Sequence, residues 1–205
     1  MNINFKDVDA YCLTVPWQKD RISFVSDTFE QAGKEVNFIY GEKTTPYSKG
    51  LAECHIQALQ MSKDNPCLIM EDDVTPTPYY DVRNFCNESF ALPDWADALY
   101  IGTSIFGRIK GQTLYGGLLA SDYSEDLLRV YNQLSLHAVI YISQKYKDAC
   151  IERFENYVMN PEGGCDDVIA DNMKYFNVFC LTSPYFYQND GHGNEPTLMK
   201  PKSVL

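Results

Sequence analysis

Apolar and polar residues follow the periods of strands and helices in turn along the first half of the chain. Apolar runs bounded by glycine or proline predict short strands. These strands span residues 8–15, 35–40, 67–74 and 98–102. Apolar positions three and four residues apart predict helices instead. The helices span residues 19–33, 48–62 and 79–90. Strands that alternate with helices in this way indicate βαβ units and a parallel sheet.

The second half of the chain has a different pattern. Glycines interrupt residues 104–120, which predicts a hairpin or a pair of loops. Strands at 135–143 and 178–181 follow, with helices at 144–157 and 166–176. The sequence contains no internal repeat, low-complexity segment or linker. We therefore expect one α/β domain over residues 1–205, with a nucleotide-binding half (1–102) and a more variable half (103–205). Its sheet would be mixed but mostly parallel and flanked by helices.

An apolar run that ends in three carboxylates is the most informative stretch of the sequence. Residues 67–70 are apolar and lead directly into Glu71, Asp72 and Asp73. Ligands of open α/β sheets bind outside the carboxyl ends of the strands, where these acids would lie. Adjacent carboxylates repel one another, and their hard oxygens favour Mg²⁺ or Mn²⁺. Side-chain alternation places Glu71 and Asp73 on one face and Asp72 on the other. A solvated acidic turn is the alternative interpretation.

Composition narrows the class of protein. The chain has 205 residues and a net charge of −11, which argues against nucleic-acid or membrane binding unless a basic groove forms. No apolar run is long enough for a transmembrane helix, and the first residues lack the apolar core of a signal peptide. Seven scattered cysteines without a Cys-x-x-Cys pair indicate a reducing compartment. We expect a cytoplasmic protein without stable membrane association.

Two further places carry candidate chemistry. Asp166 and Asp167 follow two glycines at the start of a predicted helix, where they would either satisfy the helix dipole or act as a general base. His192 lies between two glycines on a polar segment and is a candidate third metal ligand or a plain loop histidine. His55 and His137 lie among apolar residues, where a core role is more common. No phosphate-binding glycine motif and no serine or cysteine nucleophile motif is present.

An ordered set of segments resembles glycosyltransferase family 25. The first two are a Gly-x-x-x-Cys-His helix, residues 50–59, and the apolar strand 68–74 ending in Glu-Asp-Asp-Val. The strands 96–102 and 137–143, then Asp166-Asp167 with Ser183-Pro184 and Gln188, match further segments in the family's order. Two positions depart from the family pattern. Residues 13–15 are Leu-Thr-Val where Asn-Leu-Asp is frequent, and Cys54 precedes His55 where serine is usual.

The resemblance implies a GT-A fold, a Rossmann-like sheet that binds a nucleotide-sugar, and we expect a UDP-sugar. It also implies a Mn²⁺ or Mg²⁺ ion on the donor diphosphate, held by Asp73 with Glu71 and His192. The remaining contacts to the donor would come from Thr14, Val15, Arg21, His55, Glu71 and Asp72. Asp166 or Asp167 would deprotonate the acceptor hydroxyl, and attack in line would invert the sugar.

Several alternatives stay open. The acceptor is a glycan, a protein hydroxyl or a modified nucleobase such as hydroxymethylcytosine in DNA. A non-catalytic module that binds a nucleotide or a glycan with the same fold is the main competing hypothesis. A metal-dependent phosphoesterase ranks last, because two-metal sites usually need more ligands than three histidines and these acids supply.

Overall fold

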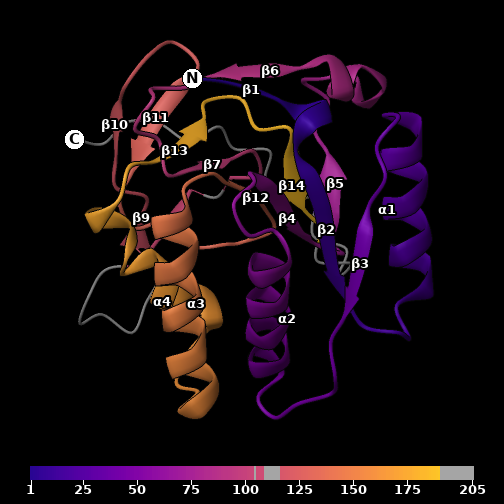
Figure 1. Cartoon of the computed structure of the whole chain (residues 1–205), viewed down its shortest axis with the longest axis vertical. Coiled ribbons are helices and arrows are strands. Elements are labelled where there is room, and N and C mark those ends of the chain that lie inside the picture. The colour runs from indigo at the N-terminus through magenta and orange to yellow at the C-terminus, as the bar shows by residue number, and fades with distance from the viewer. Residues whose placement is uncertain (104, 109–115, 190–205) are drawn as a thin grey trace.

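Eight strands form one twisted sheet in the computed structural model, which describes residues 1–103, 105–108 and 116–189 (Figure 1). Their order across the sheet is β10-β11-β13-β7-β12-β4-β2-β3. The strands are β2 (Asp9–Thr14), β3 (Asn37–Tyr40), β4 (Cys67–Glu71), β7 (Ala98–Tyr100), β10 (Ala120–Asp122), β11 (Leu127–Val130), β12 (Ala138–Tyr141) and β13 (Val178–Leu181). Both halves of the chain therefore contribute to a single mixed α/β domain.

Pairing directions confirm the predicted α/β class but correct the expected excess of parallel pairs. Strand β2 pairs in parallel with β3 and β4, and β13 pairs in parallel with β7. Strand β12 is antiparallel to both β4 and β7, and the β10-β11-β13 ribbon is antiparallel throughout. Among the described strands, parallel pairing thus does not predominate. A buried apolar run indicates a strand but carries no information about its direction, so only the tertiary arrangement shows that β12 is reversed.

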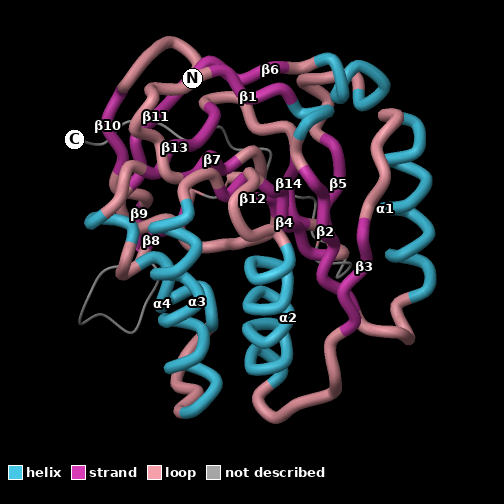
Figure 2. Tube along the Cα trace, viewed as in Figure 1, coloured by secondary structure: helices cyan, strands magenta, loops and turns pink. Residues whose placement is uncertain are grey.

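Helices cover the two faces of the sheet unequally (Figure 2). Helices α2 (Tyr47–Met61), α3 (Gln144–Met159) and α4 (Cys165–Ala170) pack on one face, and α1 (Lys19–Gln31) packs on the other. Strand β4 is buried on both sides, since Ile69 faces the first group of helices and Leu68 the face of α1. Burying each such side chain contributes about 1.5–3 kcal/mol. In the part of the chain that the structure describes, no helix combines the length and apolarity needed to cross a bilayer.

Helix ends follow the local sequence. Gly33 ends α1 with φ +70°, donating its N–H to the carbonyl of Glu30 at 2.9 Å, as predicted for a glycine stop. Helix α3 begins after Ser143, whose hydroxyl oxygen accepts the N–H of Tyr146 at 3.3 Å. Helix α4 begins after Gly163 and Gly164, and Gly163 has φ +75°. Local residues therefore define the end of α1 and the starts of α3 and α4.

Three short ribbons lie outside the large sheet in the described part of the chain. They pair β1 (Asn2–Asn4) with β6 (Ser89–Ala91), β5 (Val74–Pro76) with β14 (Phe186–Gln188), and β8 (Phe106–Gly107) with β9 (Gly116–Gly117). The last pair is antiparallel, which agrees with the hairpin, one of the two alternatives predicted for residues 104–120.

Two helix predictions need correction. The helix predicted at 79–90 is instead a 3₁₀ helix, η2 (Val82–Asn87), followed by strand β6. Phe85 and Phe90 are buried in the α1-side core, so tertiary packing overrides the helical spacing there. The helix predicted at 166–176 is divided into α4 and a second 3₁₀ helix, η3 (Met173–Tyr175).

Candidate functional site

The carboxyl ends of three neighbouring strands carry the acidic segment. Strands β2, β3 and β4 run in parallel, so their carboxyl ends meet at one edge of the sheet. Glu71 is the last residue of β4 and is paired in register with Leu13 of β2. Asp72 and Asp73 form the turn between β4 and β5. The acids therefore lie where the sequence predicted them, at the edge that binds ligands in this class of fold.

Asp72 is fully engaged in contacts with its own protein. Its carboxylate is buried and accepts a hydrogen bond from the Thr14 hydroxyl at 2.6 Å and one from Nη1 of Arg21 at 2.9 Å. Burial opposes the charge of Arg21, but the hydrogen bond and the charge of Asp72 raise the pKa of the guanidinium. Because Arg21 belongs to the first turn of α1, Asp72 joins β2, α1 and β4. Arg21 was predicted to contact the donor. One-third of its side chain is exposed and available to a ligand.

Val15 was also predicted to contact the donor, but its side chain lies elsewhere. Its side chain is buried, and its carbonyl accepts the N–H of Gln18 at 3.0 Å in the turn that leads into α1. The Val15 side chain therefore belongs to the core.

Asp73 is partly buried, and its hydrogen bonding is incomplete. One carboxylate oxygen, Oδ2, accepts from Nε2 of Gln188 at 3.0 Å, a contact made possible by the pairing of β14 with β5. The other oxygen, Oδ1, is buried and has no hydrogen-bond partner among the described residues. Burial raises the pKa of Asp73 above its ordinary value of 3.8, and the hydrogen bond from Gln188 only partly offsets this. An unpaired carboxylate oxygen shielded from water is costly unless a cation or a proton reaches it.

Glu71 extends the same cluster of negative charge. Burial raises its pKa well above the ordinary 4.5, and repulsion from Asp73, Asp166 and Asp72 raises it further. We name Glu71, Asp73 and Asp166 the acid cluster. Asp72 is not included in this name, because it is paired with Arg21.

The carboxylates of the acid cluster suit a divalent cation that is shared with a ligand. Within residues 1–103, 105–108 and 116–189, no group of three metal-binding side chains is arranged to hold an ion by itself. His192, the predicted third ligand, lies outside the described residues. Mg²⁺ and related ions are commonly held by one or two carboxylates together with the phosphates of a substrate. The free Oδ1 of Asp73, with Glu71 nearby, fits such a shared ion and not an all-protein metal cage.

The structure separates the roles of the two acids at the start of α4. Asp167 accepts the backbone N–H of Gly164 at 3.1 Å and forms an ion pair with Nη1 of Arg108 at 2.9 Å. Arg108 also contacts Asp171 at 3.3 Å, which ties the β8–β9 hairpin to α4. Asp167 is therefore a helix-capping and anchoring residue. Its role is the one that the helix-dipole interpretation of the sequence predicts.

Asp166 instead faces the acid cluster. Its Oδ2 accepts the backbone N–H of Ser135 at 3.1 Å, and burial raises the pKa of the carboxyl. Its charge is among those that raise the pKa of Glu71. A Cβ atom on Gly164 would come within 2.5 Å of Oδ1 of Asp166, which explains why a glycine precedes this acid. The structure thus brings the start of α4 to the end of β4.

Ser135 and His137 support Asp166, and the sequence had not indicated this. Ser135 has φ +80°, an uncommon backbone conformation for a residue with a side chain. In this conformation its N–H points at Asp166 while its hydroxyl contacts Nδ1 of His137. His137 is buried beside Gly102, and burial lowers its pKa to about 4. The neutral imidazole therefore acts as a fixed support, in line with the core role expected of it.

His55 does not lie at the site. Its ring is fully buried in the middle of α2 and stacks on Phe154 with 4.9 Å between the ring centroids. Burial lowers its pKa to about 3, so the ring is neutral at physiological pH. The contact to the donor that the family resemblance implied is therefore not supported. The apolar face of α2 explains this histidine as a core residue.

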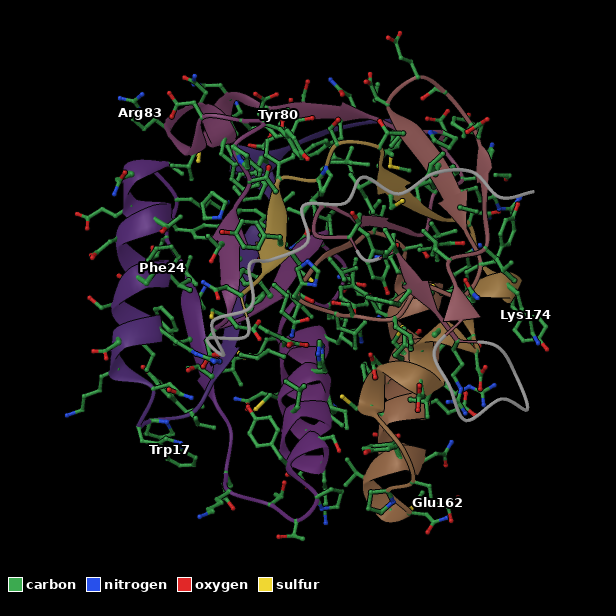
Figure 3. All side chains as sticks on the ribbon, turned by 180° about the vertical axis from the view of Figure 1, so that it is seen from behind. Trp17, Phe24, Tyr80, Arg83, Glu162 and Lys174 are labelled. Carbon is green, nitrogen blue, oxygen red and sulfur yellow. The ribbon has the colours of Figure 1, made fainter. Side chains whose placement is uncertain are left out.

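Two exposed aromatic rings border the acidic edge, and the pattern of the sequence did not single them out. Tyr47 is the first residue of α2 and is 60% exposed. Partial burial of the side chain, followed by the charges of Asp72, Glu71 and Asp73, raises its pKa. Trp17 is 55% exposed. It lies between the carboxyl end of β2 and the start of α1 (Figure 3).

Comparison with known proteins shows the fold alone. No family model and no curated protein matches the sequence. The structure is similar to UDP-glucose pyrophosphorylase complexed with UDP-glucose, with a TM-score of 0.51 and 8% identity over 89% of this chain and 92% of the other. The apo form of UDP-glucose pyrophosphorylase gives the same TM-score at 7% identity, with the same coverage. A197 from STIV is 12% identical over 87% of this chain and 83% of its own, with a TM-score of 0.45.

Proposed function

We propose that this protein is a metal-dependent glycosyltransferase that moves a sugar from a UDP-sugar to an acceptor hydroxyl. The observation that carries the proposal is the acid cluster, in which Asp73 Oδ1 is buried without a described partner at the carboxyl edge of parallel strands. The fold is shared with a protein solved in complex with UDP-glucose, and this supports a nucleotide-sugar at that edge. The ordered resemblance to glycosyltransferase family 25 points to sugar transfer.

Donor binding would use the residues at the ends of β2 and β4. Asp73, with help from Glu71, would hold the divalent ion. The ion, when bound, neutralises the negative charge that develops on the diphosphate leaving group. Arg21 is held in place by Asp72 and is one-third exposed, so its guanidinium would contact the donor. The exposed rings of Tyr47 and Trp17 offer flat faces on which a uracil could stack.

Asp166 is the general base in this proposal. Its raised pKa brings the carboxylate closer to the neutral range, in which proton transfer is most effective. The N–H of Ser135 holds the carboxylate in position, so it could take the proton of an acceptor hydroxyl as that oxygen attacks the anomeric carbon. Attack from the side opposite the diphosphate would invert the configuration of the sugar. Residues 103–205 would then supply the acceptor side.

Thermal denaturation with UDP and Mn²⁺, added singly and together, tests the donor site. We expect a rise in melting temperature that requires both ligands, because ligands that bind only the native state stabilise it. Asp73→Asn should remove the joint effect. Glu152→Gln, which changes an exposed acid on α3, is the matched control and should keep it. A shift with UDP that does not depend on the metal, or no shift at all, would contradict the proposal.

Turnover is tested separately by the release of UDP from a panel of UDP-sugars in the presence of Mn²⁺. The parent protein should release UDP slowly in water and faster with an acceptor, and Asp166→Asn should lose both activities while it keeps the joint thermal shift. If the parent protein shows the shift but releases no UDP with any glycan, protein or modified-DNA acceptor, it is a non-catalytic binding module instead.

A further inference from the structure

Two half-exposed aromatic rings form a corner on the sheet, away from the acid cluster. Trp95 is 48% exposed and Tyr123 is 47% exposed. Their ring centroids lie 5.9 Å apart and their planes meet at 89°. Trp95 precedes β7, whereas Tyr123 follows β10, so only the tertiary structure brings them together. We name this pair the aromatic corner.

A buried ring forms the floor of the aromatic corner. Phe179 of β13 is fully buried, with its centroid 5.5 Å from that of Trp95 and 5.1 Å from that of Tyr123. Both exposed rings are therefore packed against a fixed surface. A rigid aromatic platform loses little conformational entropy when a ligand binds to it.

Arg129 backs the corner and is itself held in place. It is the cross-strand partner of Phe179, and its guanidinium lies over the ring of Trp95, 6.0 Å from the centroid. Its Nη2 donates to Asn177 Oδ1 at 2.9 Å, and Asn177 donates its backbone N–H to the buried carboxylate of Asp97 at 2.8 Å. The Nε of Arg129 has no hydrogen-bond partner among the described residues. The corner thus combines apolar faces with a rigid network of polar groups.

The aromatic corner is distinct from the acid cluster. Strand β13 is separated from β4 by β7 and β12, and three strand spacings of about 4.8 Å amount to about 14 Å. The floor residue Phe179 lies on the face of α1, within the described core. Ligands of the two sites would therefore not share contacts.

Charges around the corner restrict the chemistry of its ligand. Asp94, beside Trp95, is paired with the N-terminal ammonium group. The other acids beside the two rings in the sequence are exposed: Asp122, Glu125 and Asp126. They would repel phosphates, sulfates and nucleic acid. A cationic ligand would meet the guanidinium of Arg129, which already lies over Trp95. A neutral ligand fits both conditions.

We propose that the aromatic corner is a binding site for a neutral glycan. One face of a pyranose ring is a row of C–H groups, which pack on the electron-rich face of an aromatic ring. Its hydroxyl groups can donate to an exposed carboxylate such as Asp122, which directly precedes Tyr123 in the sequence. Two rings at a right angle suit a sugar that rests one face on Trp95 and one edge on Tyr123. This site does not depend on the proposed transferase activity, because binding here needs neither metal nor nucleotide.

Fluorescence titration tests this proposal directly, since the chain has two tryptophans. Trp17→Phe leaves Trp95 as the only emitter, and Trp95→Phe leaves Trp17 as the matched control. We would titrate both variants with neutral oligosaccharides of glucose, galactose, mannose and N-acetylglucosamine. At least one series should give a saturable change in the Trp17→Phe variant and none in Trp95→Phe. Adding Tyr123→Ala to Trp17→Phe should weaken binding roughly tenfold, the factor that corresponds to 1.4 kcal/mol.

Three results would overturn the proposal. The first is the absence of any saturable change in Trp95 emission with every neutral series. The second is loss of the Trp95 response on Asp73→Asn, because the glycan would then bind at the acid cluster. The third is a blue shift of Trp95 emission that depends on protein concentration alone, together with self-association in sedimentation that Trp95→Ala abolishes. The corner would then be a contact between copies of the chain.

Discussion

Two acidic segments, Asp72-Asp73 after β4 and Asp166-Asp167 at the start of α4, show the same division of roles. In each segment one carboxylate is paired with an arginine and fastens secondary structure elements together. Asp72 pairs with Arg21 and Asp167 with Arg108. The other carboxylate of each segment, Asp73 or Asp166, has a pKa raised by burial and forms no ion pair among the described residues, although the charge of Arg21 partly offsets the rise at Asp73.

This comparison teaches that neighbouring acids of equal appearance in the sequence differ in what compensates their charge. A carboxylate with a fixed guanidinium partner is already neutralised and serves the fold. A carboxylate that is buried without such a partner raises the free energy of the native state unless a ligand supplies the missing cation or takes up a proton. Acids of the second kind are the stronger candidates for function. The following predictions test whether the division holds.

The largest expected effect is the loss of metal-dependent activity on Asp73→Asn. An amide oxygen keeps the size of the side chain but not the charge, so we expect the rate of UDP-sugar turnover to fall on the order of 10⁴-fold. The assay is UDP release at saturating Mn²⁺. The thermal shift with UDP and Mn²⁺ should vanish as well, since both results follow from one lost ligand. Full activity in Asp73→Asn would show that the metal site lies elsewhere.

Asp166→Asn should lower the turnover rate on the order of 10³-fold, a typical contribution of general acid–base catalysis. Donor binding should be unchanged, because Asp166 would act on the acceptor hydroxyl. Asp167→Asn provides the comparison within the same segment. It should lower the melting temperature, through loss of the Gly164 and Arg108 contacts, with a much smaller loss of rate. If Asp167→Asn is the more damaging to the rate, the roles assigned to the two acids are reversed.

Stability should respond in opposite directions at Asp72 and Asp73. Asp72→Ala leaves Arg21 and the Thr14 hydroxyl without their partner, and we expect a loss of about 2 kcal/mol in the free energy of unfolding. This value allows for screening, because Arg21 is one-third exposed. Asp73→Ala removes a repelled carboxylate and should leave stability unchanged or higher when EDTA is present. Urea denaturation of both variants measures the difference, and equal losses would contradict the division.

The smallest effect is a difference in the pH dependence of stability. The pKa of Asp73 in the native protein is raised above 3.8, so the native state binds this proton more tightly than the unfolded state. The resulting stabilisation is present below pH 3.8 and is lost as the pH rises through the raised pKa. In EDTA, Asp73→Asn should therefore gain melting temperature relative to the parent protein as the pH rises above about 4.

Asp81 is the opposite control for this pH experiment. The hydrogen bond from Arg83 lowers the pKa of Asp81, so its contribution is present above pH 3.8 and is lost as the pH falls. Asp81→Asn should lose melting temperature relative to the parent protein as the pH rises. The same sign for both variants would show that burial does not govern Asp73.

Much of the fold could be predicted because local patterns dominate there. The strand at Val178–Leu181 has the predicted bounds, and α1 ends two residues before Gly33, the glycine predicted to stop it. Other elements could not be predicted, for identifiable physical reasons. Strand β11 was missed, since its stability comes from pairing with β13 and not from a clear alternation of its own. The 3₁₀ helix η2 replaced a predicted helix, because Phe85 is drawn into the core.

The sequence by itself determined the position of the acids at the end of a buried strand, because an apolar run followed by charges can end only at the edge of a core. Only the tertiary structure decided which of those acids are paired. Arg21 reaches Asp72 across 51 positions of sequence and Arg108 reaches Asp167 across 59, so no local pattern encodes either contact. The same holds for Ser135 beside Asp166 and for Trp95 beside Tyr123. Charge compensation and ring packing depend on distances of a few ångströms, and these are set by the folded chain.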